Sequence, residues 1–158
     1  MNYPIPTHLQ PFLNVVGDDN SEYEVTGVIH CPCGCDEFEV FESNDRQIVK
    51  LKCKKCGKEI EVLDTGKHGW NGFVCKDDFT DRSLPFNQFV CDECGKDSFK
   101  VTVSISSQGK EDFIEECVAN DDSFSEDDWV DGFEWIRISL ECVNCSCADE
   151  EWVDMELM

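Results

Sequence analysis

The stretch "HCPCGCDEFEVFE" at residues 30–42 places three cysteines, Cys31, Cys33 and Cys35, within five positions. A second stretch, "VCDECGKDSFKVT" at residues 90–102, is a looser copy of it. When the two Cys-Gly pairs are superimposed, the phenylalanines that follow them coincide as well. The cysteine spacing before each glycine differs, however, so the two stretches are alike without being identical.

Further cysteines extend this likeness into two sets, and Cys75 and Cys117 belong to neither. The first set is Cys31, Cys33, Cys35, Cys53 and Cys56, and the second is Cys91, Cys94, Cys142, Cys145 and Cys147. In each set a cysteine knuckle is followed by a pair of possible strands and then by a second knuckle. The distance between knuckles is 20 residues from Cys33 to Cys53 and 48 residues from Cys94 to Cys142. We therefore predict an internal duplication in which the second copy carries an insertion.

Alternation of apolar and polar residues predicts the strands that connect these knuckles. In "FKVTVSI" the apolar residues fall on one face of an extended chain, and "FEWIRISLEC" shows the same period of two. We expect strands at 38–42, 47–53, 58–64, 99–105, 133–142 and 149–156. Helical periodicity is weak throughout, and residues 111–119 are the best candidate for a short helix.

The knuckles have the spacing of metal ligands. Four thiolates bind one Zn²⁺ as a tetrahedron, and a C-x-x-C turn supplies two of them from one side. "CKKCG" at 53–57, "CDECG" at 91–95 and "CVNCS" at 142–146 have this form. Glycine after the second cysteine permits a left-handed backbone, which lets amide groups point back at a sulfur.

These motifs and their strand order resemble the zinc ribbon family, whose small β-rich modules are held by two knuckles around one zinc ion. The resemblance covers residues 23–65 and 88–157. In that family the four knuckle cysteines are the ligands, and this implies two structural Zn²⁺ ions. The resemblance assigns Cys91, Cys94, Cys142 and Cys145 to the second ion, and Cys53 and Cys56 to the first.

The other half of the first site has three possible forms. Cys31 with Cys33 makes a shortened C-P-C-G turn, His30 with Cys33 keeps the x-x spacing, and Cys31 with Cys35 makes a wider turn. "CPCG" also looks like the start of the SEC-C zinc motif, although the closing cysteine pair of that motif is missing here. We predict Cys31 and Cys33, and leave the other two forms as alternatives.

The predicted fold is mostly β, with two small zinc-ribbon-like modules. The segments are an extended N-terminal segment at 1–22, a first module at 23–66, a connecting segment at 67–87 and a second module at 88–158, with an acidic insertion at 107–131. We expect the N-terminal segment to be extended or loosely packed. We expect Trp70 and Phe73 of the connecting segment to pack between the modules.

Cysteine content and the N-terminal sequence indicate a reducing compartment. The chain of 158 residues holds 12 cysteines, a density that is also found in secreted disulfide scaffolds. It opens "MNYPIPTHLQPFLNVVGDDN", with neither a basic start nor an apolar run of signal length, and no stretch is long enough to span a membrane. We therefore expect a cytoplasmic protein whose clustered cysteines bind metal.

The charge predicts the kind of partner. With 35 acidic and 13 basic residues the formal net charge is −22, which disfavours nucleic acid and favours a basic protein partner. Residues 111–134 include 11 acidic residues and no lysine or arginine, with aromatic residues interleaved. We select as candidate partner-binding residues Asp121, Asp122, Glu126, Asp127, Asp128, Trp129 and Asp131.

The predicted function is therefore binding without catalysis, and no catalytic residues are assigned. Three scattered histidines and the absence of a phosphate-binding loop or dinucleotide fingerprint make an enzyme unpromising. By analogy of charge, the chain is similar to immunity proteins and phage inhibitors that mimic nucleic acid. Two alternatives are rubredoxin-like electron transfer, with iron in place of zinc, and a nucleic-acid-associated zinc ribbon that uses the lysine-rich run "KLKCKKCGK" at 50–58.

Overall fold

Strands dominate the computed structural model, which describes residues 3–74, 83, 85–120 and 123–157. Strand residues make up 39% of the chain and helical residues 16%, so the fold is mostly β as predicted. The elements are η1 (Thr7–Leu9), β1 (Leu13–Val15), β2 (Glu24–Ile29), β3 (Phe38–Ser43), β4 (Ile48–Cys53), β5 (Glu59–Asp64), α1 (Gly69–Val74), β6 (Phe86–Phe89), β7 (Phe99–Ser106), α2 (Lys110–Ala119), η2 (Glu126–Val130), β8 (Trp135–Cys142) and β9 (Ala148–Glu156).

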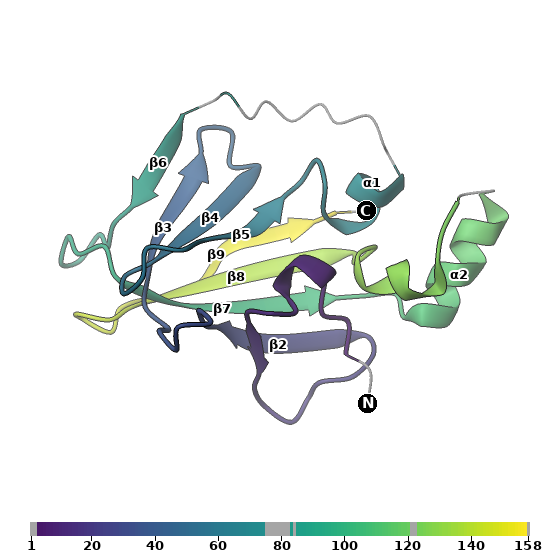
Figure 1. Cartoon of the computed structure of the whole chain (residues 1–158), viewed down its shortest axis with the longest axis horizontal. Helices are drawn as coiled ribbons and strands as arrows, with labels where there is room; N and C mark the ends of the chain where they lie inside the picture. The colour runs from purple at the N-terminus through teal and green to yellow at the C-terminus, as the bar shows by residue number, and fades with distance from the viewer. Residues whose placement is uncertain (1–2, 75–82, 84, 121–122, 158) are drawn as a thin grey trace.

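The strands are arranged as two antiparallel layers that join at one corner. One layer has the order β1-β2-β7-β8-β9 and the other has the order β6-β3-β4-β5. They meet where β3 pairs with β7, at Phe38 opposite Phe99. In Figure 1 the layer that contains β3 and β4 lies above the layer that contains β7 and β8.

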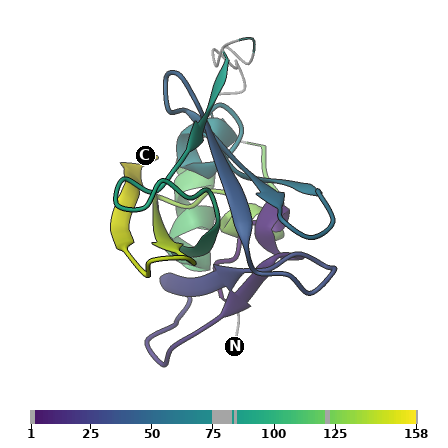
Figure 2. The ribbon, with the colours of Figure 1, turned by 90° about the vertical axis from the view of Figure 1, so that its left-hand side faces the viewer.

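The helices lie at one end of the layers. In Figure 1, α2 is at the right-hand end, opposite the loops that join β6 to β7 and β8 to β9 at the left. Figure 2, which views the molecule from those loops, shows α2 behind the strands. The loops that carry the cysteines are therefore separated from the helices by the length of the strands.

One hydrophobic core fills the space between the layers. Alternate residues of β7, from Phe99 to Ile105, are buried, and so are Ile136, Ile138 and Leu140 of β8, as the alternation predicts. The same cluster includes Val40 of β3, from the other layer. The two predicted modules thus share one core, and the boundaries at 23–66 and 88–158 do not separate two cores. The duplication itself stays a prediction.

The N-terminal segment is part of this core, which corrects the expectation that it is loosely packed. Leu9 and Leu13 are buried, and β1 pairs with β2 through Leu13 opposite Ile29. The side chain of His8 hydrogen-bonds the carbonyl oxygen of Val62 at 2.8 Å. The segment therefore closes the edge of the molecule next to β5.

A second, smaller cluster joins α1, α2 and η2. The Trp70 ring packs edge-on against Phe113 with ring centroids 5.8 Å apart, and the cluster also buries Cys117, Trp129 and Val130. Trp70 thus packs against the acidic insertion rather than between two modules. The aromatic residues of the insertion use their apolar surface to hold α1 and α2 together.

Candidate metal centres

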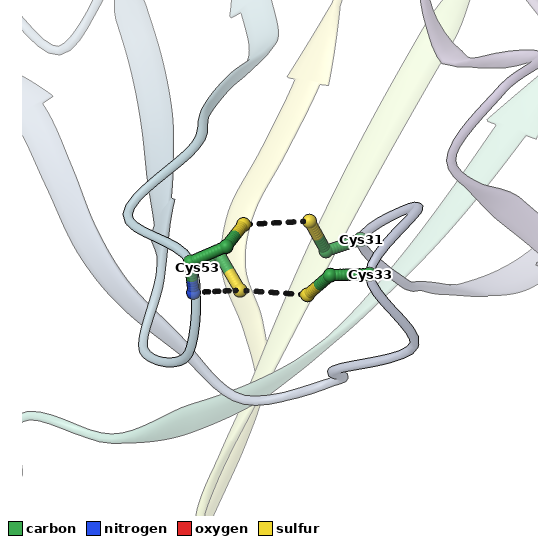
Figure 3. A group of neighbouring side chains, drawn as sticks. Cys31, Cys33 and Cys53 are labelled. Carbon is green, nitrogen blue, oxygen red and sulfur yellow. Dashed lines mark hydrogen bonds between the residues drawn. The ribbon is translucent and has the colours of Figure 1, made fainter.

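The first group of sulfur atoms brings together two loops. Cys31 and Cys33 come from the loop between β2 and β3, and Cys53 and Cys56 come from the end of β4 and the turn after it. The sulfur atoms of Cys31 and Cys56 are 3.4 Å apart, and those of Cys33 and Cys53 are 3.6 Å apart. Figure 3 shows Cys31 and Cys33 facing Cys53 across the gap between the loops.

The second group has the same arrangement. The sulfur atom of Cys91 lies 3.5 Å from that of Cys145, and the sulfur atom of Cys94 lies 3.5 Å from that of Cys142. In both groups the first cysteine of one knuckle faces the second cysteine of the other. Within each group all four sulfur atoms lie within 4.8 Å of one another.

These distances fit a tetrahedral metal ion. S–Zn bonds of about 2.3 Å place the corners of a tetrahedron about 3.8 Å apart, close to the sulfur separations in both groups. A disulfide needs about 2.05 Å, and the eight cysteines of the two groups are free thiols. Two four-cysteine groups could therefore hold two metal ions, and the donor set suits zinc or iron.

Backbone hydrogen bonds explain how the shortened knuckle reaches the same geometry. In the regular knuckles the carbonyl oxygen of the first cysteine accepts a hydrogen bond from the backbone N–H four residues later. In the third knuckle, for example, the N–H of Gly95 donates to the carbonyl oxygen of Cys91 at 2.8 Å. In the first knuckle the donor is Gly34, three positions after Cys31, also at 2.8 Å. The first turn is therefore one residue shorter than the others. Its tighter backbone hydrogen bond still brings the sulfur atoms into the same pairing.

The structure therefore places Cys31, not His30, in the four-sulfur group. The His30 backbone N–H donates to the carbonyl oxygen of Phe12, the residue before β1. Cys35 lies outside the group as well, because its sulfur accepts from the backbone N–H of Glu37 at 3.4 Å. Cys35 and Cys147 hold matching positions, since their carbonyl oxygens accept from the first cysteines of their knuckles, at 2.7 and 2.8 Å.

The residue after the second cysteine has a left-handed backbone in all four knuckles. Glycine supplies it in three, and the fourth is Ser146, with a φ of 62°. A Cβ atom in this region clashes with the following carbonyl group, at a cost of roughly 1–2 kcal/mol. The fourth knuckle therefore carries strain that the other three avoid.

The sulfur atoms of the first group do not ionise together. Burial opposes ionisation of Cys53, but the backbone N–H groups of Cys56 and Lys55, together with the thiols of Cys33 and Cys56, lower the pKa of Cys53 to about 6. The backbone N–H of Cys33 favours the thiolate of Cys31, but burial and the neighbouring sulfur atoms raise the pKa of Cys31 to about 12. The four sulfur atoms therefore differ in how readily they ionise.

The second group divides its protons in the same way. The backbone N–H of Lys96 helps to lower the pKa of Cys94 to about 6. The backbone N–H of Cys147 favours the thiolate of Cys145, but the Cys91 thiol and other neighbours raise the pKa of Cys145 to about 12. A divalent cation supplies the positive charge that lets four sulfur atoms become thiolates at once.

Charged side chains connect the two groups at the corner between the layers. Lys54, which follows Cys53, has its ammonium nitrogen 3.0 Å from a carboxylate oxygen of Asp97, which follows the third knuckle. Lys100 and Asp36 approach to 3.9 Å in the same region. The hydrogen bond to Lys54 lowers the pKa of Asp97 and raises that of Lys54.

Two carboxylates of the acidic run selected from the sequence form hydrogen bonds within the protein. Asp131 accepts from the backbone N–H and the hydroxyl group of Thr7, both at 2.8 Å, and Asp128 accepts from the backbone N–H of Ser125 at 2.7 Å. Trp129 is 5% exposed, so its ring is not a surface anchor, which corrects that part of the prediction. Glu126 and Asp127 are exposed, whereas Asp121 and Asp122 lie outside the described residues.

The structure adds a feature that the sequence analysis missed. A groove of about 560 Å³ lies beside the second sulfur group, between the third knuckle and the start of β9. Its lining includes five carboxylates, from Asp92, Glu93, Asp149, Glu150 and Glu151. The acidic run "ADEE" at 148–151, directly after the last knuckle, was the one signal in the sequence that pointed to this acidic groove.

Comparison with known proteins assigns no family. No family model, no curated protein and no solved structure matches this chain. Among the described residues, no helix is both long and apolar enough to cross a membrane. Function must therefore be inferred from the sulfur groups and from the surface.

Neighbouring cysteines of the first knuckle provide a matched test of the ligand assignment. We expect Cys33→Ser to lose one of two bound metal ions, because it removes a sulfur from the group. Cys35→Ser should keep both ions, because its sulfur contacts the backbone of Glu37 instead. Native mass spectrometry gives the metal count. Loss of an ion in Cys35→Ser, with full occupancy in Cys33→Ser, would contradict the assignment.

The strained knuckle predicts a stabilising substitution. Ser146→Gly should raise the free energy of unfolding by about 1 kcal/mol, because glycine adopts the left-handed backbone without the Cβ clash. Gly95→Ser, at the matching position of the third knuckle, should lower it by a similar amount. Urea unfolding at constant metal content measures both. If both variants shift stability in the same direction, backbone strain is not the cause.

Proposed function

We propose that the two sulfur groups bind zinc as structural ions and that the protein acts by binding a partner, without catalysis. The observation that supports this most directly is that each group is complete, with four cysteine sulfur atoms at tetrahedral separations. A structural zinc site of this kind leaves no coordination position for a substrate or an activated water. Free thiols in both groups are consistent with the cytoplasm, which is the setting we propose.

Zinc also accounts for how a chain with so much negative charge stays folded. Metal binding to small four-ligand sites contributes on the order of 10 kcal/mol or more to folding. Each ion links loops that are distant in sequence, as Cys31 and Cys56 illustrate. Because four thiolates outweigh one Zn²⁺, two loaded sites change the net charge from −22 to about −26.

We propose a basic protein as the partner. Self-repulsion opposes folding in a chain with this charge, so the excess of carboxylates calls for an explanation beyond stability. A surface of exposed carboxylates attracts a basic protein and repels nucleic acid. Proteins that imitate nucleic acid, such as immunity proteins and phage-type inhibitors, use this principle, and inhibition or recruitment of the partner is the outcome we propose.

The contacts of the lysine-rich run count against the nucleic-acid alternative. Lys54 is paired with Asp97 at 3.0 Å and lies 3.8 Å from Glu39. Lys58 and Lys50 lie over the rings of Phe12 and Phe86, at 6.0 and 4.9 Å from the ring centroids. Such contacts draw these ammonium groups toward the protein's own side chains rather than toward a phosphate backbone.

Electron transfer by bound iron is the second candidate, because an iron site would use a contact that the structure shows. The backbone N–H groups of Lys55 and Cys56 point at the sulfur of Cys53, at 3.4 and 3.5 Å. Such N–H···S contacts stabilise thiolates and tune the potential of an iron–sulfur site. They are equally useful to zinc, so the identity of the metal decides between the two functions.

Metal removal tests the structural role. A chelator should extract two zinc ions per chain and unfold the protein, because the loops that hold the strand ends lose their crosslinks. Circular dichroism follows the unfolding, and elemental analysis of the untreated protein identifies the metal. Red protein that contains iron would overturn the zinc proposal, and a metal-free chain with an unchanged spectrum would overturn the structural role.

Binding to simple probes tests the kind of partner. An octapeptide of alternating lysine and valine should bind, and its affinity should fall as salt rises, since the attraction is electrostatic. An alternating glutamate and valine octapeptide and a short DNA duplex, both labelled with fluorescein, should not bind. Fluorescence anisotropy measures all three. Tighter binding to the duplex than to the lysine peptide would reverse the proposal in favour of nucleic acid.

A further inference from the structure

We propose that the groove between β6 and β9 binds an extended, lysine- or arginine-rich segment of the partner, which adds to the open edge of β9 as a strand. This inference rests on the proposed function, because it names the surface through which a basic protein is bound. It places that surface beside the second sulfur group, away from the acidic run at 111–134.

The floor of the groove is apolar. It is formed by Phe89 at the end of β6, Phe99 at the start of β7 and Leu140 near the end of β8. The rings of Phe89 and Phe99 have centroids 5.2 Å apart, and Phe89 lies 5.3 Å from the ring of Trp152 on β9. The groove therefore lies against the edge of the core, and a volume of about 560 Å³ is within the range of ligand-binding clefts.

Two sheet edges border this opening. Among the described strands, β6 pairs with β3 and β9 pairs with β8, so each has its other edge free of strand pairing. Free strand edges present N–H and C=O groups to which an extended peptide can add. The exposed residues of β9 at 148–151 line the groove, so we assign the pairing to this edge.

The carboxylates along the two sides of the groove favour a basic ligand. Asp92 and Glu93 stand on one side, on the third knuckle, and Asp149, Glu150 and Glu151 stand on the other, at the start of β9. Among these five exposed residues, Glu151 has a basic neighbour, Arg137, at 4.0 Å. No lysine or arginine lines the groove in the part of the chain that the structure describes. Lysine and arginine side chains on an extended peptide would meet carboxylates on both sides of it.

The test compares two charge reversals of equal size. Asp92→Lys with Glu150→Lys changes both sides of the groove, whereas Glu126→Lys with Asp127→Lys changes the exposed part of the acidic run. The probe is the alternating lysine and valine octapeptide, and zinc content and circular dichroism confirm that each variant is folded. We expect the groove variant to bind at least about tenfold more weakly than the unchanged protein, and the control variant to bind within about twofold of it.

Two further peptides test strand addition. They carry N-methyl groups at the odd or at the even positions, so that each blocks hydrogen bonding along one edge of the peptide. We expect one of them to lose binding and the other to keep it, because only one edge of the peptide faces β9. Equal binding of both methylated peptides and the parent would overturn the assignment to the β9 edge.

The outcomes separate this inference from the proposed function. If the unchanged protein does not bind the lysine peptide, the proposal of a basic partner fails. If the unchanged protein binds the peptide and both charge reversals weaken that binding equally, the attraction depends on total charge and the groove is not the binding site. If the control variant alone loses binding, the acidic run is the surface and the groove is wrong.

Discussion

Four sulfur atoms held within touching distance impose the main constraint on this protein. In each group, the sulfur atoms lie 3.4–3.6 Å from their nearest partners, near the ends of strands that are far apart in sequence. Without a cation, the ionised and protonated sulfur atoms divide as Cys53 and Cys31 do. A bound metal ion would convert this conflict into a crosslink. On the proposed function, the strand ends and the loops that carry these cysteines are held by that crosslink.

The corner between the two layers makes the two groups parts of one structure. Phe38 pairs with Cys53 on one side and with Phe99 on the other, and Phe99 in turn pairs with Cys142. A ladder of four residues thus runs from a ligand of the first group to a ligand of the second. The ion pair between Lys54 and Asp97 crosses the same corner and links the segments that follow the second and third knuckles. Independent motion of two modules is difficult to reconcile with this continuity.

Local patterns predicted what depends on local chemistry. Alternation predicted β7 and β8, and the C-x-x-C spacing predicted three of the four knuckles, because both features follow from neighbouring residues. Tertiary contacts decided the remainder. Leu9 and Leu13 become core residues through β1 and β5, and no pattern within a proline-rich segment reveals those neighbours. The shortened first knuckle was likewise ambiguous, because its missing residue is replaced by a backbone rearrangement.

The same distinction separates carboxylates with a structural task from those without one. Asp131 and Asp128 lie in the most acidic stretch of the sequence, yet they tie down the N-terminal segment and the start of η2. Trp129 of that stretch supports the small cluster. Asp92 and Glu93 lie on an exposed knuckle, where they add to the repulsion around thiolates that already carry excess negative charge. Carboxylates in such a position repel one another and the nearby sulfur atoms, and no contact among the residues that the structure describes accounts for most of them, which is why we propose that a basic segment binds beside this strand edge.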